Sequence, residues 1–85
     1  MKNKCEIALK TSFKKSIRKL SKNYREMINK AISKLSENPF IGEKLKGKYE
    51  ELRKLRIGKY RIIYDAMQCK AILIILEHRE TVYRK

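Results

Sequence analysis

Lys54-Leu55-Arg56-Ile57-Gly58-Lys59-Tyr60-Arg61 is a basic run that contains a single glycine, and it gives the strongest indication of the fold. Cationic and apolar side chains alternate on both sides of the glycine, which is the period of a β-strand. Two residues that include a glycine, placed between two such runs, are typical of a tight hairpin turn. The stretch therefore predicts a β-hairpin, with strands over residues 49–57 and 60–66 and a turn at Gly58-Lys59.

The sequence that follows the hairpin predicts a third strand. Residues 67–70 turn the chain, and residues 71–78 are almost continuously apolar. Such a run has the length of a strand and is typical of a central strand that is buried on both faces. We therefore expect the strands between residues 49 and 78 to form an antiparallel meander. The tail, residues 79–85, either extends the last strand or lies beside it.

The N-terminal part predicts a strand followed by a short helix. Residues 4–10 alternate with period two, and three apolar side chains share one face: Cys5, Ile7 and Leu9. This pattern indicates a strand. Thr11 and Ser12 then supply helix-capping chemistry, and apolar residues recur at helical spacing over residues 13–20. This second segment is expected to form a short amphipathic helix.

A longer helix is predicted after a break at residues 21–23. Its apolar side chains over residues 24–35 fall on one stripe of a helix. The helix should end at Asn38-Pro39, because the residue before a proline disfavours the helical region. Residues 39–48 are expected to form a loop.

The order of these elements predicts an α+β fold. The order is βααβββ, in which a helix hairpin returns the chain so that the later strands can pair. Helices that cover one face of an antiparallel sheet give a two-layer α+β architecture. The chain has 85 residues and contains no low-complexity linker. We therefore expect residues 1–85 to form a single domain.

The charge balance points to a polyanionic partner. The chain has 23 Lys and Arg residues against 9 Asp and Glu residues, a net charge of +14 at pH 7. Such a charge favours nucleic acid, an anionic membrane or an acidic protein as the partner. No apolar run approaches the ~18 residues of a membrane span, and the N-terminus lacks the apolar stretch of a signal peptide. We therefore expect a soluble, cytoplasmic protein that does not bind a membrane.

The residues that commonly bind metals or cofactors are scarce. Cys5 and Cys69 are the only cysteines, and they belong to no Cys-x-x-Cys motif. His78 is the only histidine, which excludes a site built on two histidines. No Gly-rich phosphate loop and no Gly-x-Ser-x-Gly motif is present. The sequence therefore predicts reduced, buried, structural cysteines, no metal site and no cofactor.

The predicted hairpin carries a cluster of cations on one face. Alternation places Lys54 and Arg56 on that face and turns Leu55 and Ile57 to the other. Arg61 lies across the turn, and cross-strand neighbours stand about 5 Å apart. Repulsion in such a cluster is relieved when a polyanion binds, so the pattern predicts a phosphate-binding surface. A solvated basic face is the alternative interpretation.

The chain after the apolar strand offers further candidates. Positive charge near Tyr83, from residues such as Arg79, favours the phenolate and lowers the pKa of a tyrosine. Tyr83 is therefore a candidate proton acceptor, although it could equally pack at a strand end. Alternation places His78 with Ile72, Ile74 and Leu76. This favours a structural role for His78 over a role as acid or base.

Two motifs together resemble the signature of RelE/ParE superfamily toxins. They are Leu52-Arg53-Lys54-Leu55-Arg56-Ile57-Gly58-Lys59-Tyr60-Arg61-Ile62-Ile63-Tyr64 and His78-Arg79-x-x-Val82-Tyr83. Asn38-Pro39 and Leu45-Lys46-Gly47 also match the stretch that leads into the hairpin. The resemblance covers essentially the whole chain and agrees with the βααβββ order and the basic charge. It implies the RelE-like microbial RNase fold.

The resemblance implies a toxin of a type II toxin–antitoxin system. Toxins of the RelE branch enter the ribosomal A site and cut the messenger RNA there without a metal. The 2′-hydroxyl attacks the adjacent phosphate, which leaves a 2′,3′-cyclic phosphate and a free 5′-hydroxyl. An acidic RelB-like antitoxin wraps around the toxin and blocks it. The resemblance thus implies a ribosome-dependent endoribonuclease that inhibits translation.

The resemblance also implies roles for individual residues. Arg61 matches the arginine that clamps the phosphate in the transition state. Lys54 matches a basic position that stabilises charge or assists proton transfer. Arg79 matches a second arginine on the phosphate, and Tyr83 matches a C-terminal tyrosine that acts as general base or stacks on a base. The remaining basic positions are implied RNA contacts: Arg53, Arg56, Lys59 and Arg84.

The chain also departs from the RelE pattern. Leu52 stands where the RelE type has a second basic residue, and the spacing from Arg79 to Tyr83 is shorter than in the best-known member. Two alternatives stay open: a ParE-like toxin that inhibits DNA gyrase without catalysis, and a plain RNA-binding protein. The ParE branch typically lacks the pair that Lys54 and Tyr83 match, so this pair favours the nuclease.

Overall fold

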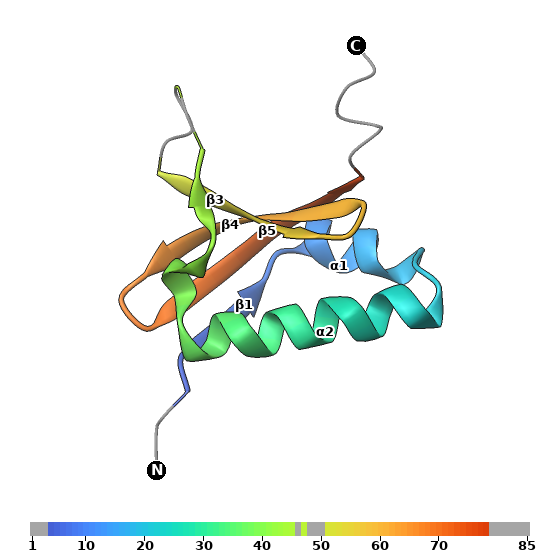
Figure 1. The fold of residues 1–85 in the computed structure, drawn as a ribbon, viewed down its shortest axis with the longest axis horizontal. Coiled ribbons are helices and arrows are strands. Elements are labelled where there is room, and N and C mark those ends of the chain that lie inside the picture. The colour runs from blue at the N-terminus through green and yellow to red at the C-terminus, as the bar shows by residue number, and fades with distance from the viewer. Residues whose placement is uncertain (1–3, 46, 48–50, 79–85) are drawn as a thin grey trace.

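The computed structural model describes residues 4–45, 47 and 51–78. Within these residues, strands form one mixed sheet in the order β1-β5-β4-β3-β2, and helices pack against it (Figure 1). Along the chain the elements are β1 (Glu6–Leu9), α1 (Thr11–Arg18), α2 (Lys22–Glu37), the 3-10 helix η1 (Pro39–Ile41), β2 (Glu43–Lys44), β3 (Leu52–Ile57), β4 (Tyr60–Met67) and β5 (Lys70–His78). The predicted α+β class and the βααβββ order are confirmed, with one short strand added.

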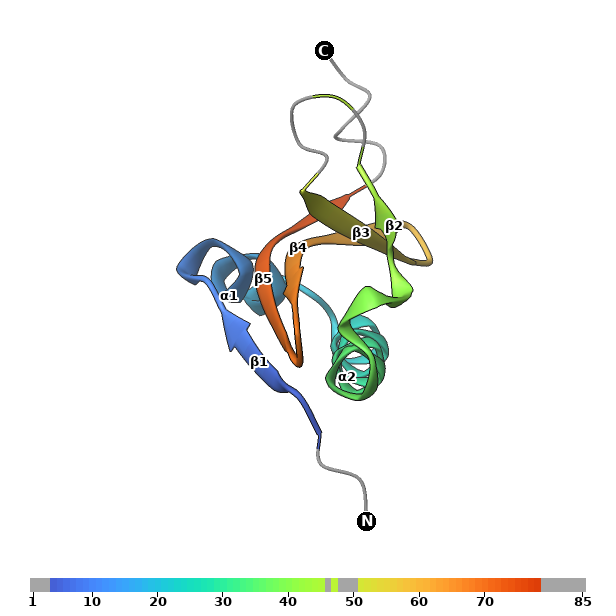
Figure 2. The same ribbon diagram turned by 90° about the vertical axis from the view of Figure 1, so that its left-hand side faces the viewer.

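The predicted hairpin supplies the central strand of the sheet, β4, and its neighbour β3. β3 and β4 pair antiparallel from Leu52 opposite Asp65 to Ile57 opposite Tyr60. Gly58 in the turn has a φ of 58°, a left-handed conformation that glycine adopts without steric cost. β4 and β5 also pair antiparallel, which completes the predicted meander. β1 pairs with β5 in parallel on the far side (Figure 2).

The core lies between this sheet and the helices. α2 runs along one face of the sheet, as Figure 1 shows, and buries one stripe of its surface. Its Ile28 and Leu35 belong to the same apolar cluster as Phe13 of α1 and Ile62 and Leu73 of the sheet. These five side chains and that of Tyr64 are almost fully buried, so burial of this core is the main source of stability.

A bulge in β5 corrects one sequence-based expectation. Ile63 pairs with Ile75, whereas the next residue, Tyr64, pairs with Leu73, so Ile74 is the extra residue. The shift turns Leu73 and not Ile74 toward the core, where Leu73 is fully buried. The expectation that His78 shares its face with Ile72 and Ile74 is therefore wrong. The other face of β5 is only half-buried, so the expected burial on both faces is wrong as well.

The ends of the helices differ slightly from the prediction. Lys10 is the N-cap of α1, and Ser12 lies inside the helix. The Ser12 hydroxyl donates to the carbonyl of Ile74 at the bulge, so tertiary contact replaces the expected capping role. α2 begins at Lys22, earlier than expected, and ends before Asn38-Pro39 as predicted.

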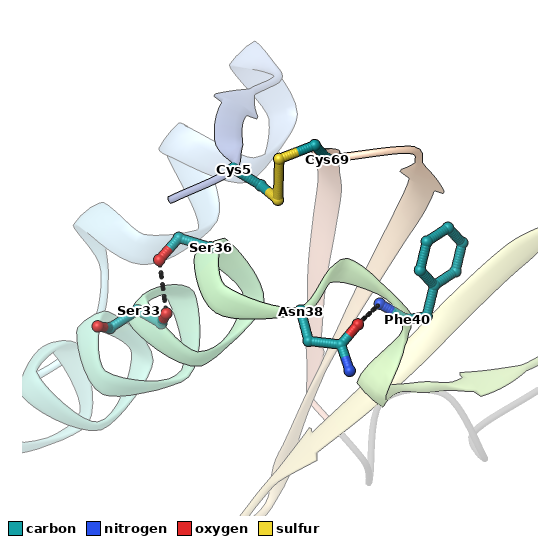
Figure 3. Close-up of a disulfide and its surroundings, with 6 residues drawn as sticks. All are labelled: Cys5, Ser33, Ser36, Asn38, Phe40 and Cys69. Atoms are coloured by element: carbon teal, nitrogen blue, oxygen red, sulfur yellow. Dashed lines mark hydrogen bonds between the residues drawn. A yellow bond between two sulfur atoms is a disulfide. The ribbon is translucent and has the colours of Figure 1, made fainter. Parts of the chain in front are cut away.

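The segment predicted as a loop contains two short elements. The side chain of Asn38 caps η1 by accepting a hydrogen bond of 3.0 Å from the backbone N–H of Phe40 (Figure 3). β2 then pairs with β3 through Glu43 opposite Lys54 and Lys44 opposite Arg53. The predicted first strand of the hairpin begins at Leu52, and residues 49 and 50 lie outside the described part of the chain.

Cys5 and Cys69 form a disulfide (Figure 3), which overturns the prediction of reduced cysteines. Parallel pairing of β1 with β5 brings Cys5 beside the turn that contains Cys69, and the backbone N–H of Glu6 donates to the carbonyl of Cys69. Their Cα atoms lie 4.4 Å apart, although 64 positions separate the residues in sequence. Cys69 is exposed and Cys5 half-buried, so the expected burial is wrong too.

Neither of the described helices α1 and α2 combines the length and the apolar character that a membrane crossing requires.

Candidate nucleic-acid interface

The predicted cationic face lies on the sheet surface that faces away from the core. Leu55 and Ile57 pack against the core cluster, so Lys54 and Arg56 point to the opposite side, as alternation predicted. Arg56 lies directly opposite Arg61 in the β3–β4 register. Side chains at such positions are about 5 Å apart at Cβ, so the two arginine side chains leave the sheet side by side. We call Lys54, Arg56 and Arg61 the cationic face.

Arg61 of the cationic face is largely buried. Its side chain is 14% exposed, and its Nε lies 3.9 Å from Oε1 of Glu77, its neighbour on β5. The carboxylate offsets part of the repulsion from Arg56 and restrains the arginine. A small hollow of about 30 Å³ is bordered by Arg56, Gly58, Tyr60 and Arg61. Two arginine residues therefore border one hollow, an arrangement suited to an anionic oxygen.

Arg53 lies outside the cationic face. Its Nη1 donates to the carbonyl oxygens of Gly42 at 2.6 Å and Phe40 at 3.3 Å. Its guanidinium also lies 5.1 Å from the centroid of the Phe40 ring, a cation–π contact. These contacts hold η1 and β2 to the sheet. The described contacts of Arg53 are structural, and its implied contact with RNA stays a prediction.

Tyr64 also holds the segment of η1 and β2 to the sheet, from the side of the core. Its hydroxyl accepts a hydrogen bond of 2.9 Å from the backbone N–H of Gly42. Burial raises the pKa of this hydroxyl above its usual value, while the Gly42 hydrogen bond and the charge of Arg53 act to lower it. Sequence reasoning missed both anchors of β2, because each joins residues that are distant along the chain.

His78 takes part in an aromatic stack at the end of β5. Its ring meets Tyr60 edge-on at 4.9 Å, and Tyr60 meets Tyr24 of α2 at 5.1 Å. This packing is what a structural role requires. The other residues predicted at this end of the sheet, Arg79, Tyr83 and Arg84, lie outside the described part of the chain. Lys59 is exposed in the hairpin turn.

The described residues contain no cluster of three or more His, Cys, Asp or Glu side chains that is arranged to hold a metal ion. The cationic face provides positive charge, and the β-sheet holds its side chains in place. Such a surface can bind phosphate and stabilise charge that develops on phosphoryl oxygens.

Comparison with known proteins gives one family and one fold. The family model described as the ParE toxin of type II toxin-antitoxin systems, parDE, matches residues 7–83. No curated protein sequence gives a significant match.

Several solved structures share the fold. The toxin–antitoxin complex RelBE2 from Mycobacterium tuberculosis matches with a TM-score of 0.80 and 20% identity, over 89% of this chain and 99% of that one. The archaeal RelE-RelB complex from Pyrococcus horikoshii matches with a TM-score of 0.76 and 20% identity, over 96% and 99% of the two chains. The isolated RelE toxin of E. coli matches with a TM-score of 0.74 and 23% identity, over 94% and 97%. The fold is therefore RelE-like, as the sequence predicted.

Proposed function

The chain belongs to the ParE toxin family of type II toxin–antitoxin systems, and we propose that it inhibits translation as a ribosome-dependent endoribonuclease. In this proposal it cuts messenger RNA in the ribosomal A site, acts in the cytoplasm, and is neutralised by an acidic RelB-like antitoxin. The single observation that carries the proposal is the cationic face, where two arginines meet on adjacent strands beside a lysine.

The proposed reaction needs little from the protein beyond charge and a base. The 2′-oxygen of a nucleotide forms a bond to the adjacent phosphorus as the bond to the 5′-oxygen breaks. A base takes the 2′-hydroxyl proton, and the leaving 5′-oxygen gains a proton. Negative charge grows on the phosphoryl oxygens in the transition state, so fixed cations lower the barrier. No metal or cofactor has a part in this scheme.

The geometry supports a division of roles. Arg61 is restrained by Glu77 and half-enclosed by the sheet, which suits a clamp on the reacting phosphate. Lys54 lies on the same face, two residues before Arg56 in β3, and is proposed to help bind the phosphate or transfer a proton. Arg56 borders the same hollow as Arg61 and is proposed to bind RNA.

The remaining proposed roles extend from the sequence resemblance. Arg79 is proposed as a second phosphate contact and Tyr83 as the general base or a stacking partner for a base. Lys59 and Arg84 are proposed RNA contacts. The same assignment for Arg53 is weaker, because its guanidinium already binds two carbonyl groups.

A second candidate function is inhibition of DNA gyrase without catalysis. The observation that favours it is the family model, which is named for the ParE toxin. The two functions predict different damage in cells, because a nuclease shortens transcripts whereas a gyrase poison leaves breaks in DNA.

The test is induction of the protein in bacterial cells, followed by mapping of transcript ends and of DNA breaks. We expect cleaved transcripts, intact DNA, and loss of both toxicity and cleavage in Arg61→Ala. The matched control is Arg25→Ala, which removes one exposed cation from α2 and should remain toxic. Circular dichroism of the purified variants verifies that each is folded. DNA breaks with intact transcripts would establish the second function and overturn the first.

A further inference from the structure

The carboxylate of Glu77 lies beside Arg61 on the outer face of the sheet, the side that faces away from the core. Glu77 pairs with Arg61 across β4 and β5, and its neighbour Leu76 belongs to the core, so alternation turns Glu77 outward. Its side chain is 35% exposed, which makes it accessible to a bound molecule. The proposed reaction needs a base, and an ionised carboxylate is an acceptor.

The other carboxylates that the described strands place on the outer face are farther from Arg61. Glu43 lies on β2, two strands away from β4. Asp65 lies four residues along β4, and Glu6 lies on β1 beside the opposite end of β5. Strands about 4.8 Å apart and a rise of about 3.3 Å per residue put all three more than about 10 Å from Arg61 at Cα. The register therefore favours Glu77 as the base.

The contact between Glu77 and Arg61 keeps a carboxylate next to the proposed phosphate clamp. Oε1 of Glu77 lies 3.9 Å from Nε of Arg61. At that distance charge, and not a hydrogen bond, joins these two atoms. A phosphate held by Arg61 brings its attacking 2′-oxygen within about 3–3.5 Å of the phosphorus atom. The hydroxyl proton is then presented in the region that the Glu77 carboxylate occupies.

The strand order places Glu77 and the cations of β3 on opposite sides of Arg61. In this reaction the attacking and leaving oxygens lie roughly in line, on opposite sides of the phosphorus atom. Glu77 is on β5, whereas Lys54 and Arg56 are on β3, and β4 with Arg61 runs between these strands. RNA that crosses from β5 to β3 therefore brings its 2′-hydroxyl to Glu77 and its leaving 5′-oxygen toward Lys54.

We propose that Glu77 is the general base of the cleavage reaction. The inference rests on the proposed nuclease function and assigns the proton acceptor of that same site. Two roles are proposed for Tyr83, and this assignment leaves it the stacking role.

The proton transfers of the step balance without a metal or cofactor. The Glu77 carboxylate takes the proton of the 2′-hydroxyl as the 2′-oxygen bonds to phosphorus. The bond from phosphorus to the 5′-oxygen breaks, and this oxygen takes a proton from Lys54. Glu77 then passes its proton to water and Lys54 regains one from water, which restores the protein. Arg61 stabilises the charge on the phosphoryl oxygens.

The first measurement compares Glu77→Gln with the parent protein on programmed ribosomes. We expect the cleavage rate to fall about a hundredfold or more, because the amide cannot take the proton. Binding to ribosomes whose messenger RNA has a 2′-deoxy nucleotide at the cut, and so cannot be cleaved, should be about two- to fivefold tighter, because one negative charge leaves the surface. Glu26→Gln, the same change at an exposed position of α2, should alter neither quantity.

The second measurement distinguishes a base from a residue that acts only as the partner charge of Arg61. Formate restores a negative charge beside Arg61, whereas imidazole at about pH 8 is an uncharged base. We expect imidazole, as well as formate, to raise the cleavage rate of Glu77→Ala at least about tenfold, and chloride to have no effect. Cleavage by Glu77→Gln at the parent rate, loss of ribosome binding along with cleavage, or a Glu77→Ala variant that does not respond to imidazole would each overturn the proposal.

Failure of the general base is distinguishable from failure of the proposed function. If the parent protein and Glu77→Gln cut transcripts equally well, only the assignment of Glu77 is contradicted. If the parent protein cuts no transcript on programmed ribosomes, the nuclease is contradicted and the general base with it.

Discussion

Two residues of the cationic face, Arg56 and Arg61, lower the stability of the free protein while they form the proposed binding surface. Arg56 and Arg61 lie opposite each other with like charge, and Glu77 relieves only part of this repulsion from β5. Like charges at directly opposite positions of a sheet destabilise the fold. A surface that lowers stability in the free protein is expected where a polyanion later binds.

The first prediction is that Arg56→Ala stabilises the free protein and weakens RNA binding. Removing the repulsion with Arg61 should raise the free energy of unfolding by a few tenths of a kcal/mol. Urea denaturation measures the stability, and binding of a short single-stranded RNA measures the function. Arg25→Ala, an exposed cation on α2, serves as the control for loss of one charge. A variant that loses stability and binds RNA normally would show that Arg56 is structural.

The second prediction concerns the pH dependence of stability. Burial raises the pKa of Tyr64 above its usual value, so above about pH 10 the unfolded chain loses this proton while the folded chain retains it. The stability from this difference is complete below about pH 10 and is lost as the pH rises through the folded pKa. Tyr64→Phe should lose stability less steeply than the parent protein over about pH 9 to 11 in chemical denaturation. Equal slopes would contradict the burial of this hydroxyl.

At the scale of elements, the short strand β2 is held in place by residues that are distant from it along the chain. Arg53 and Tyr64 hold the backbone of Gly42 from two sides. A Cβ atom at Gly42 would lie 2.6 Å from the carbonyl oxygen of Lys54 and from the hydroxyl of Tyr64. The backbone of β2 can therefore approach β3 this closely only because residue 42 is glycine.

The third prediction follows from this close approach. Gly42→Ala should destabilise the protein by about 1–3 kcal/mol, because β2 or Tyr64 must move to relieve overpacking. Thermal denaturation measures the loss. In the double variant with Tyr64→Phe, which removes one of the two clashing oxygens, the effect of the alanine should shrink. An alanine that is tolerated at full stability would show that β2 is not held in this way.

The sequence predicted the elements whose signals are local. Alternation and the glycine turn specify the β3–β4 hairpin, and the apolar stripe together with Asn38-Pro39 specifies α2 and its end. The bulge at Ile74, the strand β2 and the disulfide depend on contacts between distant segments, so no local pattern reveals them. The candidate site shows the same difference between features set by local sequence and features set by distant contacts. Alternation predicted the cationic face, whereas the Glu77 contact required knowledge of which strand lies beside β4.

At the scale of the whole molecule, one disulfide joins the N-terminal segment to the turn that precedes the last described strand, β5. The disulfide connects Cys5, next to edge strand β1, to Cys69 in the turn between β4 and β5. Apart from β5, α2 also holds this N-terminal segment, because the backbone N–H of Cys5 donates to the carbonyl of Ser36. Closing a loop of 64 positions restricts the unfolded chain and so favours the native state.

The fourth prediction is that a reductant lowers the stability of the whole domain. Chain-entropy arguments give a loss of about 4 kcal/mol for a loop of this length. Denaturation with and without dithiothreitol measures the change. The double variant Cys5→Ser, Cys69→Ser should be as unstable as the reduced parent protein, both with and without dithiothreitol. Its stability should therefore not respond to the reductant. Equal stability of the parent protein in both conditions would contradict the stabilising role of the disulfide.

The fifth prediction concerns the central claim, that the cationic face serves RNA cleavage on the ribosome. The most direct measurement incubates the purified protein with ribosomes programmed with a defined messenger RNA and maps the transcript ends. We predict cuts within the A-site codon that leave 2′,3′-cyclic phosphates, no cuts in the absence of ribosomes, and a loss of about a hundredfold or more in rate for Arg61→Ala. Intact transcripts in the presence of folded protein and programmed ribosomes, or an Arg61→Ala variant that cuts at the parent rate, would contradict it.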